Sequence, residues 1–313
     1  MNNIVARYPI SFPQSGQTPV LRSRTVVAAG EQALIVVSPG NTRTIPVEWA
    51  VDKFELTPDG ESVLALGDDM KRGAVWETRT GRKVIELTGA EGQRQSLRAG
   101  LVMIQEELCV LVAVKNKDIV ILSATDGAER GWIATTGMIW FHFEGVIQLD
   151  PNWICITGYH DGESRDQIAA MQTSDLLQDP MALYSALVER ATVSQWGYEI
   201  AAGPAGGGHA VVVRDPEWNN EEPSLDLAES FRGIEIWDLK SNEVVQRINY
   251  SDEFDSRAVI GADNTRVVIQ SHGHVHVIAR ENGDVTSVEG MALDPYSLEL
   301  ATIQEDTISI AKL

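Results

Sequence analysis

A short unit of two apolar runs joined by a tight polar turn recurs seven times along this 313-residue chain, and this repeat constrains the fold more than any other feature. The apolar runs have the length of strands, and the turns between them are rich in Pro, Asp, Asn or Gly. Such residues either fix φ, as Pro does, or accept the positive φ that hairpin turns require. The seven units span residues 25–38, 54–67, 99–114, 145–158, 198–213, 257–271 and 291–303.

A second hairpin follows most of these units. Segments 73–87, 118–133, 233–248 and 274–288 each contain two β-type runs around a short turn rich in Gly, Asp, Asn or Ser. Each repeat therefore contains four strands, and seven repeats in this chain give about 45 residues per repeat. Four-stranded units repeated around an axis are typical of a β-propeller.

Two sequence motifs connect these repeats to a known family. Residues 236–239 read IWDL, and residues 75–78 read VWET. The first matches the Trp-Asp ending of a WD-repeat blade and the second is a diverged version of it. The chain thus resembles the WD-repeat family over nearly its whole length, although no Gly-His pair stands where that family has one. The resemblance implies an all-β fold: a seven-bladed β-propeller with four-stranded antiparallel blades, in one domain spanning residues 1–313.

The two ends of the chain are expected to close the ring. The last repeat, residues 291–313, has room for three strands only. The N-terminal segment 3–12 can supply the fourth strand, as the family resemblance implies. Closure of this kind leaves neither terminus as a loose end of the structure.

Two segments interrupt the repeat. Asp179 followed by Pro180 is typical of the start of a helix, and apolar residues at positions 181, 184, 187 and 188 share one helical stripe. The sequence therefore favours a helical insertion near residues 179–191, with an outer strand over 182–188 as the alternative. The second segment, residues 215–231, contains six acidic and no basic residues and is expected to be a long loop with room for one short helix.

The formal net charge of −20 restricts the partners of this chain. Nucleic acids are disfavoured, because binding to them depends on Lys and Arg residues that neutralise phosphates. An anionic membrane surface is disfavoured for the same reason. A protein or peptide of basic character, or a metal cation, fits the charge better. Solubility alone is the competing explanation of the acidic composition.

The cysteines and the N-terminus indicate a reducing compartment. Cys109 and Cys155 stand in apolar β-type runs without a Cys-x-x-Cys spacing, which is typical of buried packing. The N-terminal segment lacks the basic and apolar regions of a secretory signal, and no apolar run is long enough to span a membrane. We therefore expect a cytoplasmic protein.

The WD-repeat resemblance also implies a binding face. In such propellers, one face carries the connections between the second and third strands and those between blades. The longer connections of this chain are expected there: 12–24, 48–53, 88–98, 135–144, 159–166, 174–197, 214–232 and 249–256. Aromatic residues in loops are typical anchors of recognition surfaces. Nine are candidate partner-binding residues: Trp49, Trp140, Phe141, Phe143, Tyr159, Trp196, Trp218, Tyr250 and Phe254. The alternative is that several of them fill the interfaces between blades.

The segment His272, His274 and His276 is the one place where the sequence suggests a metal site. Neighbouring residues on one face of a strand lie about 6.6 Å apart, so two of these imidazoles could chelate one Zn²⁺ ion but three could not. Glu305 or Asp306 from another blade would have to complete the site. No spacing here matches a known metal site, so ordinary packing of the histidines is favoured and no cofactor is expected.

Two functions from different classes follow from these observations. The first is a non-catalytic scaffold that binds a protein or peptide on the loop-rich face, which is expected to be aromatic and acidic, since a closed ring holds several loops in fixed positions. The alternative is a propeller enzyme, such as a metal-assisted hydrolase, lactonase or lyase, with its site at the central channel. That alternative depends on fold analogy alone, with His274 and Glu305 as the best candidate residues. A structural subunit that docks through the acidic segment 215–231 is a third reading.

Overall fold

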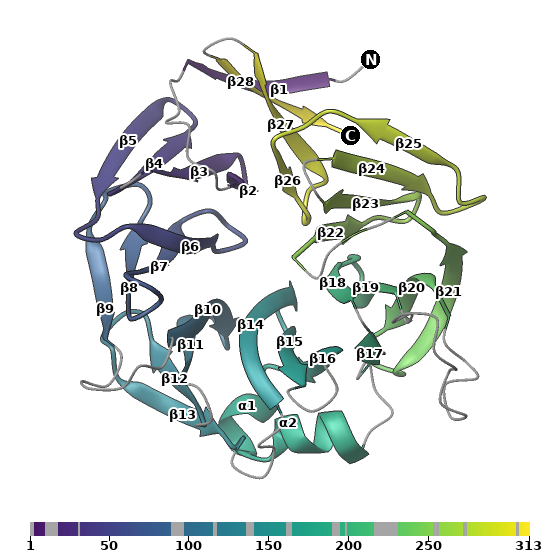
Figure 1. Ribbon diagram of the computed structural model, residues 1–313, viewed down its shortest axis with the longest axis horizontal. Coiled ribbons are helices and arrows are strands. Elements are labelled where there is room, and N and C mark those ends of the chain that lie inside the picture. Colours follow the sequence, from purple (N-terminus) through teal and green to yellow (C-terminus); the bar gives the residue numbers. More distant parts are fainter. Residues whose placement is uncertain are drawn as a thin grey trace.

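Seven four-stranded antiparallel sheets stand as blades around a central axis (Figure 1). The computed structural model of the protein describes residues 3–9, 18–30, 32–88, 97–114, 118–135, 141–160, 165–189, 195–197, 199–215, 231–252, 254, 257–271, 274–304 and 307–313. Nearly all of the regular structure in these residues is β-strand. The predicted all-β, seven-bladed propeller is thereby confirmed.

Within each blade the strands follow one another from the axis outward. Blade 1 contains β2 (Val20–Arg22), β3 (Thr25–Ala29), β4 (Ala33–Ser38) and β5 (Asn41–Pro46). Blade 2 contains β6 (Val51–Leu56), β7 (Ser62–Gly67), β8 (Arg72–Glu77) and β9 (Lys83–Thr88). Blade 3 contains β10 (Leu97–Ile104), β11 (Glu107–Val114), β12 (Ile119–Ser123) and β13 (Glu129–Ile133). Blade 4 contains β14 (Phe141–Asp150), β15 (Trp153–His160), β16 (Arg165–Gln172) and β17 (Gln195–Gly197).

The remaining blades repeat this order, and the last one joins the two ends of the chain. Blade 5 contains β18 (Glu199–Pro204), β19 (His209–Asp215), β20 (Gly233–Asp238) and β21 (Glu243–Asn249). Blade 6 contains β22 (Val259–Ala262), β23 (Arg266–Ser271), β24 (His274–Ala279) and β25 (Val285–Val288). Blade 7 contains β26 (Ala292–Asp294), β27 (Glu299–Gln304) and β28 (Thr307–Lys312), with β1 (Asn3–Pro9) as its outer strand.

The N-terminal strand closes the ring as the sequence predicted. Strand β1 pairs antiparallel with β28, from Asn3 opposite Lys312 to Pro9 opposite Thr307. Both ends of the chain therefore belong to one sheet (Figure 1). Without β1, strand β28 would become an unpaired edge, and only side-chain packing and hydrogen bonds would hold blade 7 to blade 1.

Deletion of residues 1–9 is expected to lower the Tm of the protein by several degrees. The deletion removes the whole of β1 and the backbone hydrogen bonds that it shares with β28. The matched control is deletion of residues 1–2, which precede the strand. Differential scanning calorimetry of both truncated proteins measures the effect. Equal Tm values for the two proteins would show that this strand does not stabilise the ring.

The hydrophobic core is divided into seven clusters, one at each interface between neighbouring blades. Leu66 of blade 2, for example, shares a cluster with Leu97 of blade 3, and Ile310 of blade 7 shares one with Leu21 of blade 1. Middle strands such as β7, with six buried residues in a row, are mostly apolar because blades cover both of their faces. Each blade thus depends on both neighbours, and the core is complete only when the ring is closed.

The helical insertion lies between β16 and β17. It consists of α1 (Asp175–Gln178), α2 (Ala182–Tyr184) and a π-helical turn, η1 (Ser185–Glu189). The prediction of a helix near 179–191 is confirmed, and the alternative of a strand over 182–188 is wrong because β17 is the outer strand of blade 4. The predicted stripe needs a correction: Met181 is 43% exposed, whereas Leu183 and Ala186 pack into the cluster between blades 3 and 4.

None of the helices in the part of the chain that the structure describes has the length and apolar character needed to cross a membrane.

Candidate functional site

The connections between strands divide between two faces of the ring. Because strand direction alternates within a blade, the first-to-second and third-to-fourth connections leave from one face, here named the turn face. The second-to-third connections and the links between blades leave from the other, here named the long-connection face. The turn face includes two-residue turns at 23–24, 105–106 and 151–152. The fold thus gathers most of the long connections at one end of the ring, as expected.

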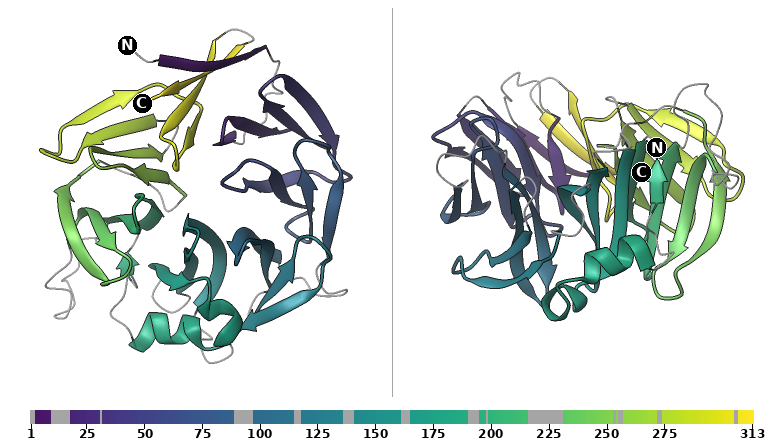
Figure 2. Two further views of the ribbon diagram at one scale, coloured as in Figure 1. Left: turned by 180° about the vertical axis from the view of Figure 1, so that it is seen from behind. Right: turned by 60° about the horizontal axis from the view of Figure 1, so that its bottom comes forward.

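One connection that was predicted for that face lies elsewhere in the structure. Segment 174–197 was expected on the long-connection face, but it joins the third and fourth strands of blade 4. Its helices lie on the outside of the ring, beside blades 3 and 4 (Figures 1 and 2). The apolar side chains of Leu176, Leu183 and Ala186 hold them there. The short strand β17 pairs only with residues 166–168 of β16, and the helices take the place beside the rest of that strand.

The structure buries most of the aromatic side chains that the sequence suggested as partner-binding anchors. The exposed fractions are 5% for Trp49, 3% for Phe141, 5% for Phe143, 6% for Tyr250 and 7% for Phe254. All five belong to clusters between blades, so the expectation of an exposed aromatic rim is corrected at these positions. The alternative, that several of these residues fill blade interfaces, describes them correctly.

Four aromatic candidates remain. Tyr159, on β15, is half-buried. Trp140 and Trp218 lie outside the described residues, as does the side chain of Trp196. The burial of Trp49 has a specific cause: a Cβ atom at Gly67 would overlap its indole ring, so the glycine allows the ring to lie against the backbone of β7. Apolar rings at the ends of blades thus complete the core of the propeller.

Acidic residues are concentrated in the connections that begin and end at the long-connection face. The segments that join strands there contain 19 Asp and Glu residues against 6 Lys and Arg residues, whereas those of the turn face, with the helical insertion included, contain 10 against 6. Among the described residues of the long-connection face, Glu48, Asp68, Asp69 and Glu289 are exposed. The negative charge of the connecting segments is therefore unevenly distributed, with the larger excess in the segments that begin and end at the long-connection face.

The turn between β7 and β8 shows how the backbone presents these carboxylates. Asp68, Asp69 and Met70 all have left-handed backbone conformations, with φ values of 57°, 55° and 62°. For residues other than glycine this conformation costs roughly 1 kcal/mol each. The Asp52 carboxylate holds the turn by accepting a hydrogen bond from the Met70 N–H at 3.1 Å. Two acidic side chains thus project from a turn that local contacts fix in an uncommon conformation.

The described residues contain no group of three His, Cys, Asp or Glu side chains that could hold a metal ion. His274 is exposed at the start of β24, and the other two weak metal candidates, His272 and Glu305, lie outside the described residues. His276 instead belongs to a polar cluster with residues of the blade 5–6 link.

That cluster joins the link to blade 6. The Nδ1 atom of His276 lies 3.0 Å from the Tyr250 hydroxyl and 3.1 Å from the Asp252 carboxylate. Burial, followed by the nearby Asp252 charge, raises the pKa of Tyr250 to about 12. The tyrosine therefore stays neutral at physiological pH, and the cluster fixes the link on the long-connection face.

Polar side chains also cross the ring axis. The Tyr296 hydroxyl, from the turn between β26 and β27 of blade 7, donates a hydrogen bond to the carbonyl oxygen of Gln148 in blade 4 at 2.8 Å. The Arg22 guanidinium of blade 1 lies over the Tyr296 ring, 5.7 Å from its centre. Lys53 of blade 2 donates to the Glu144 carbonyl oxygen of blade 4 at 3.2 Å. Side chains from blades 1, 2 and 7 thus meet near the inner strand of blade 4.

Glu55 of β6 lies in the same axial region. It keeps partial solvent exposure, but protein atoms surround it, and its Oε1 accepts a long hydrogen bond from the Leu101 N–H at 3.4 Å. Burial raises the pKa of Glu55 to about 7, although the charges of Lys53 and Arg22 act in the opposite direction. These residues, here named the axial cluster (Arg22, Lys53, Glu55, Tyr296), were not among the predicted site residues.

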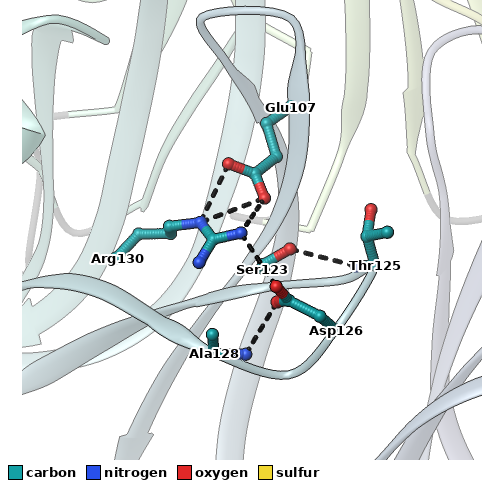
Figure 3. A network of polar contacts seen from close by, with 6 residues as sticks. All are labelled: Glu107, Ser123, Thr125, Asp126, Ala128 and Arg130. Atoms are coloured by element: carbon teal, nitrogen blue, oxygen red, sulfur yellow. Dashed lines mark hydrogen bonds and ion pairs between the residues drawn. The ribbon is translucent and has the colours of Figure 1, made fainter.

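A further polar network lies on the turn face of blade 3 (Figure 3). Arg130 of β13 donates two hydrogen bonds to Glu107, with Nε–Oε2 and Nη2–Oε1 distances of 3.0 and 2.8 Å, and one to Asp126 at 3.2 Å. These contacts raise the pKa of Arg130 and lower that of Glu107. The pKa of Asp126 is lowered mainly by the hydrogen bond from the Ala128 N–H, and Arg130 adds to the effect. Every charge in this network has a partner within the blade, so its role is to join strands and a turn.

Fold and geometry define the chain as a seven-bladed β-propeller with an acidic long-connection face. No family model matches the sequence, and no curated protein sequence matches it. The WD-repeat resemblance therefore remains an expectation from the sequence motifs.

Solved structures of other proteins have a similar fold. Hydrazine synthase of Kuenenia stuttgartiensis superposes with a TM-score of 0.62 and 11% identity, covering 97% of this chain and 99% of that chain. BamB of Moraxella catarrhalis superposes with a TM-score of 0.51 and 10% identity, covering the whole of both chains. At these identities the likeness shows the propeller fold and nothing about activity.

Proposed function

We propose that this propeller is a non-catalytic binding platform that takes a protein or peptide of basic character on its long-connection face. The observation that supports this most directly is the excess of acidic residues in the connections of that face. Complementary charge raises association rates and suppresses wrong partners. A cytoplasmic location, without a nucleic acid or membrane partner, is part of the same proposal.

The rigidity of the scaffold supports the same function. Seven interlocked clusters hold the blades, and polar contacts such as that between His276 and Tyr250 fix a link between two of them. Loops on such a scaffold bind with a smaller loss of conformational entropy than flexible loops do. The enzyme alternative would need metal ligands that converge at the centre, whereas the described axial cluster contains two cations, one carboxyl group and one phenol.

A variant in which three acidic residues of the long-connection face are neutralised is expected to bind a basic probe several-fold more weakly than the wild-type protein does. The variant is Glu48→Gln, Asp68→Asn and Asp69→Asn, three exposed positions at which the shape of the side chain is kept. The probe is a fluorescent lysine- and arginine-rich peptide, and its Kd is measured by fluorescence anisotropy at two salt concentrations. Each exposed charge contributes about 0.5 kcal/mol, so three together change Kd by roughly tenfold.

The matched control neutralises three exposed glutamates of the turn face, by Glu61→Gln, Glu106→Gln and Glu281→Gln. It changes the net charge by the same amount, so its Kd should stay close to that of the wild-type protein. If both variants weaken the probe equally, attraction is set by net charge alone and the proposed face has no special role. A Kd that neither substitution set alters would also contradict the proposal.

A further inference from the structure

Two cations near Glu55 each make a hydrogen bond to another blade. Lys53 is two residues earlier on β6, and its Nζ donates to the Glu144 carbonyl oxygen of blade 4 at 3.2 Å. Arg22, on β2, donates through Nη1 to the carbonyl oxygen of the adjacent Leu21 at 2.7 Å and to the Leu293 carbonyl oxygen of blade 7 at 3.2 Å. Both cations therefore link inner strands of different blades through neutral acceptors.

Glu55 lies within the electrostatic reach of both cations. Lys53 and Arg22 each lower the pKa of its carboxyl group, and the Leu101 N–H does so to a smaller extent, but burial outweighs all three. With the pKa raised to about 7, the carboxyl group exchanges its proton within the physiological range. A side chain that costs stability when ionised, at the centre of a packed ring, is a candidate for a regulatory role.

Groups of blades 7 and 3 also lie around this carboxyl group. Tyr296 and Asp294 belong to blade 7, and the charges of Glu55 and Asp294 both act on the Tyr296 phenol. Asp294 already accepts hydrogen bonds from the Ser23 N–H and the Tyr296 N–H. On the blade 3 side, the Glu55 carboxyl group lies beside Gly100, where a Cβ atom would be in ordinary van der Waals contact with Glu55 Oε2 at 3.5 Å. The partners that an ionised Glu55 can attract are thus Lys53 and Arg22.

We propose that the proton on Glu55 is a switch for the links across the ring axis. With the carboxyl group neutral, Lys53 and Arg22 hold blades 4 and 7 through their backbone carbonyls. With the group ionised, both cations turn toward the carboxylate, because a hydrogen bond between two charged groups is stronger than one to a neutral carbonyl. The links to blades 4 and 7 then weaken. This inference concerns the axis of the ring and does not depend on the proposed binding function.

The free energy of unfolding should depend on pH because of the Glu55 carboxyl group. Because the carboxyl group binds its proton more tightly in the folded state than in the unfolded state, stability falls as pH rises from about 4.5 to about 7 and then levels off. Glu55→Gln removes this dependence. Below about pH 4.5, the unfolding equilibrium constant of the variant should equal that of the wild-type protein. Above about pH 7, it should be roughly tenfold to a hundredfold smaller than that of the wild-type protein.

Carbon-13 NMR distinguishes the switch from a carboxyl group that is merely buried. The δ-carbon of Glu55 reports the proton, and the ζ-carbons of Arg22 and Tyr296 report the cation and the ring on which it lies. We expect all three signals to shift with one midpoint near neutral pH. In Glu55→Gln the Arg22 and Tyr296 signals should stay constant. In Lys53→Met the midpoint of Glu55 should move upward, because one nearby positive charge is lost.

Two results would overturn the switch. One is a Glu55 signal that titrates while the Arg22 and Tyr296 signals stay constant, which would leave an isolated buried acid. The other is an Arg22 and Tyr296 titration that persists in Glu55→Gln, which would assign the change to a different group. Should Glu55→Gln fold poorly, Lys53→Met still tests the proposal, because the Arg22 and Tyr296 signals should follow the shifted midpoint of Glu55.

Discussion

Gly203→Ala is expected to lower the free energy of unfolding by about 3 kcal/mol or more. Gly203 lies on β18, the inner strand of blade 5, where the backbone of β22 approaches closely. A Cβ atom there would overlap the carbonyl oxygen of Ile260 and lie 2.7 Å from its carbonyl carbon. Both atoms belong to the backbone, so no side-chain rotation relieves the overlap and the two inner strands must move apart.

The matched control for this substitution is Gly145→Ala on another inner strand, β14. The closest atoms to a Cβ at Gly145 are Thr157 Oγ1 at 3.4 Å and Lys53 Nζ at 3.7 Å, which are ordinary contacts with side-chain ends. Urea unfolding of the two variants and the wild-type protein measures the free energies. We expect a near-neutral effect for Gly145→Ala, and similar midpoints for all three proteins would contradict the close approach of blades 5 and 6.

Close contacts between inner strands recur around the ring. A Cβ at Gly261 of β22 would overlap Pro295 in the turn of blade 7, and one at Gly100 of β10 would lie 2.6 Å from Val146 of β14. These glycines allow neighbouring strands and turns to pack closely. The sequence does not show this role, because each glycine there is one small residue within an apolar run. The sequence predicts that a strand exists at such a position, but not which neighbouring backbone it touches.

The overall fold could be predicted because its signal is local and repeated. Seven hairpin units give the blade count, and the missing strand of the last repeat identifies the N-terminal segment as its partner, which β1 confirms. The helix after Pro180 was also signalled locally. The position of this helix in the ring was not signalled locally, because only the short β17 at residues 195–197 shows that the insertion leaves from the turn face.

The candidate site was less predictable for a physical reason. An aromatic residue in a connection has the same local sequence whether it faces a partner or fills a blade interface, and Trp49 and Phe141 do the latter. Burial at these positions is decided by the neighbouring blade. The charge excess of the long-connection face, by contrast, follows from sequence once the strand bounds are known, since each connection must begin and end at that face.

The axial cluster was missed because its members come from three distant parts of the chain, in blades 1, 2 and 7. The one available signal was in β6, where Lys53 and Glu55 alternate with apolar residues in an inner strand. Charged residues at alternate positions of such a strand must share a side. That side faces the neighbouring inner strands, which makes a polar cluster at the axis a reasonable expectation from this pattern.

A second large loss of stability is expected from Glu235→Gln in blade 5. The Glu235 side chain is fully buried, and its Oε1 accepts a hydrogen bond from Arg247 Nε at 2.9 Å and lies 3.7 Å from Arg214 Nη2. Trp237 Nε1 donates to its other oxygen at 3.3 Å. Burial already lowers the pKa of Arg214, which shows that its charge is held at a cost.

Glutamine keeps the size of Glu235 but not its charge, so the mostly buried guanidinium of Arg214 loses its ionic partner. Arg247 is half-exposed and can turn to water, and the cost therefore falls mainly on Arg214. Removing one partner of a buried ion pair costs about 3–5 kcal/mol, and the exposure of Arg247 reduces this to about 2–4 kcal/mol. Urea unfolding measures the loss, with the exposed Glu243→Gln on β21 as the control. Because a buried pair is only weakly screened, the loss should persist at high salt, and a loss that salt abolishes would contradict this account of blade 5.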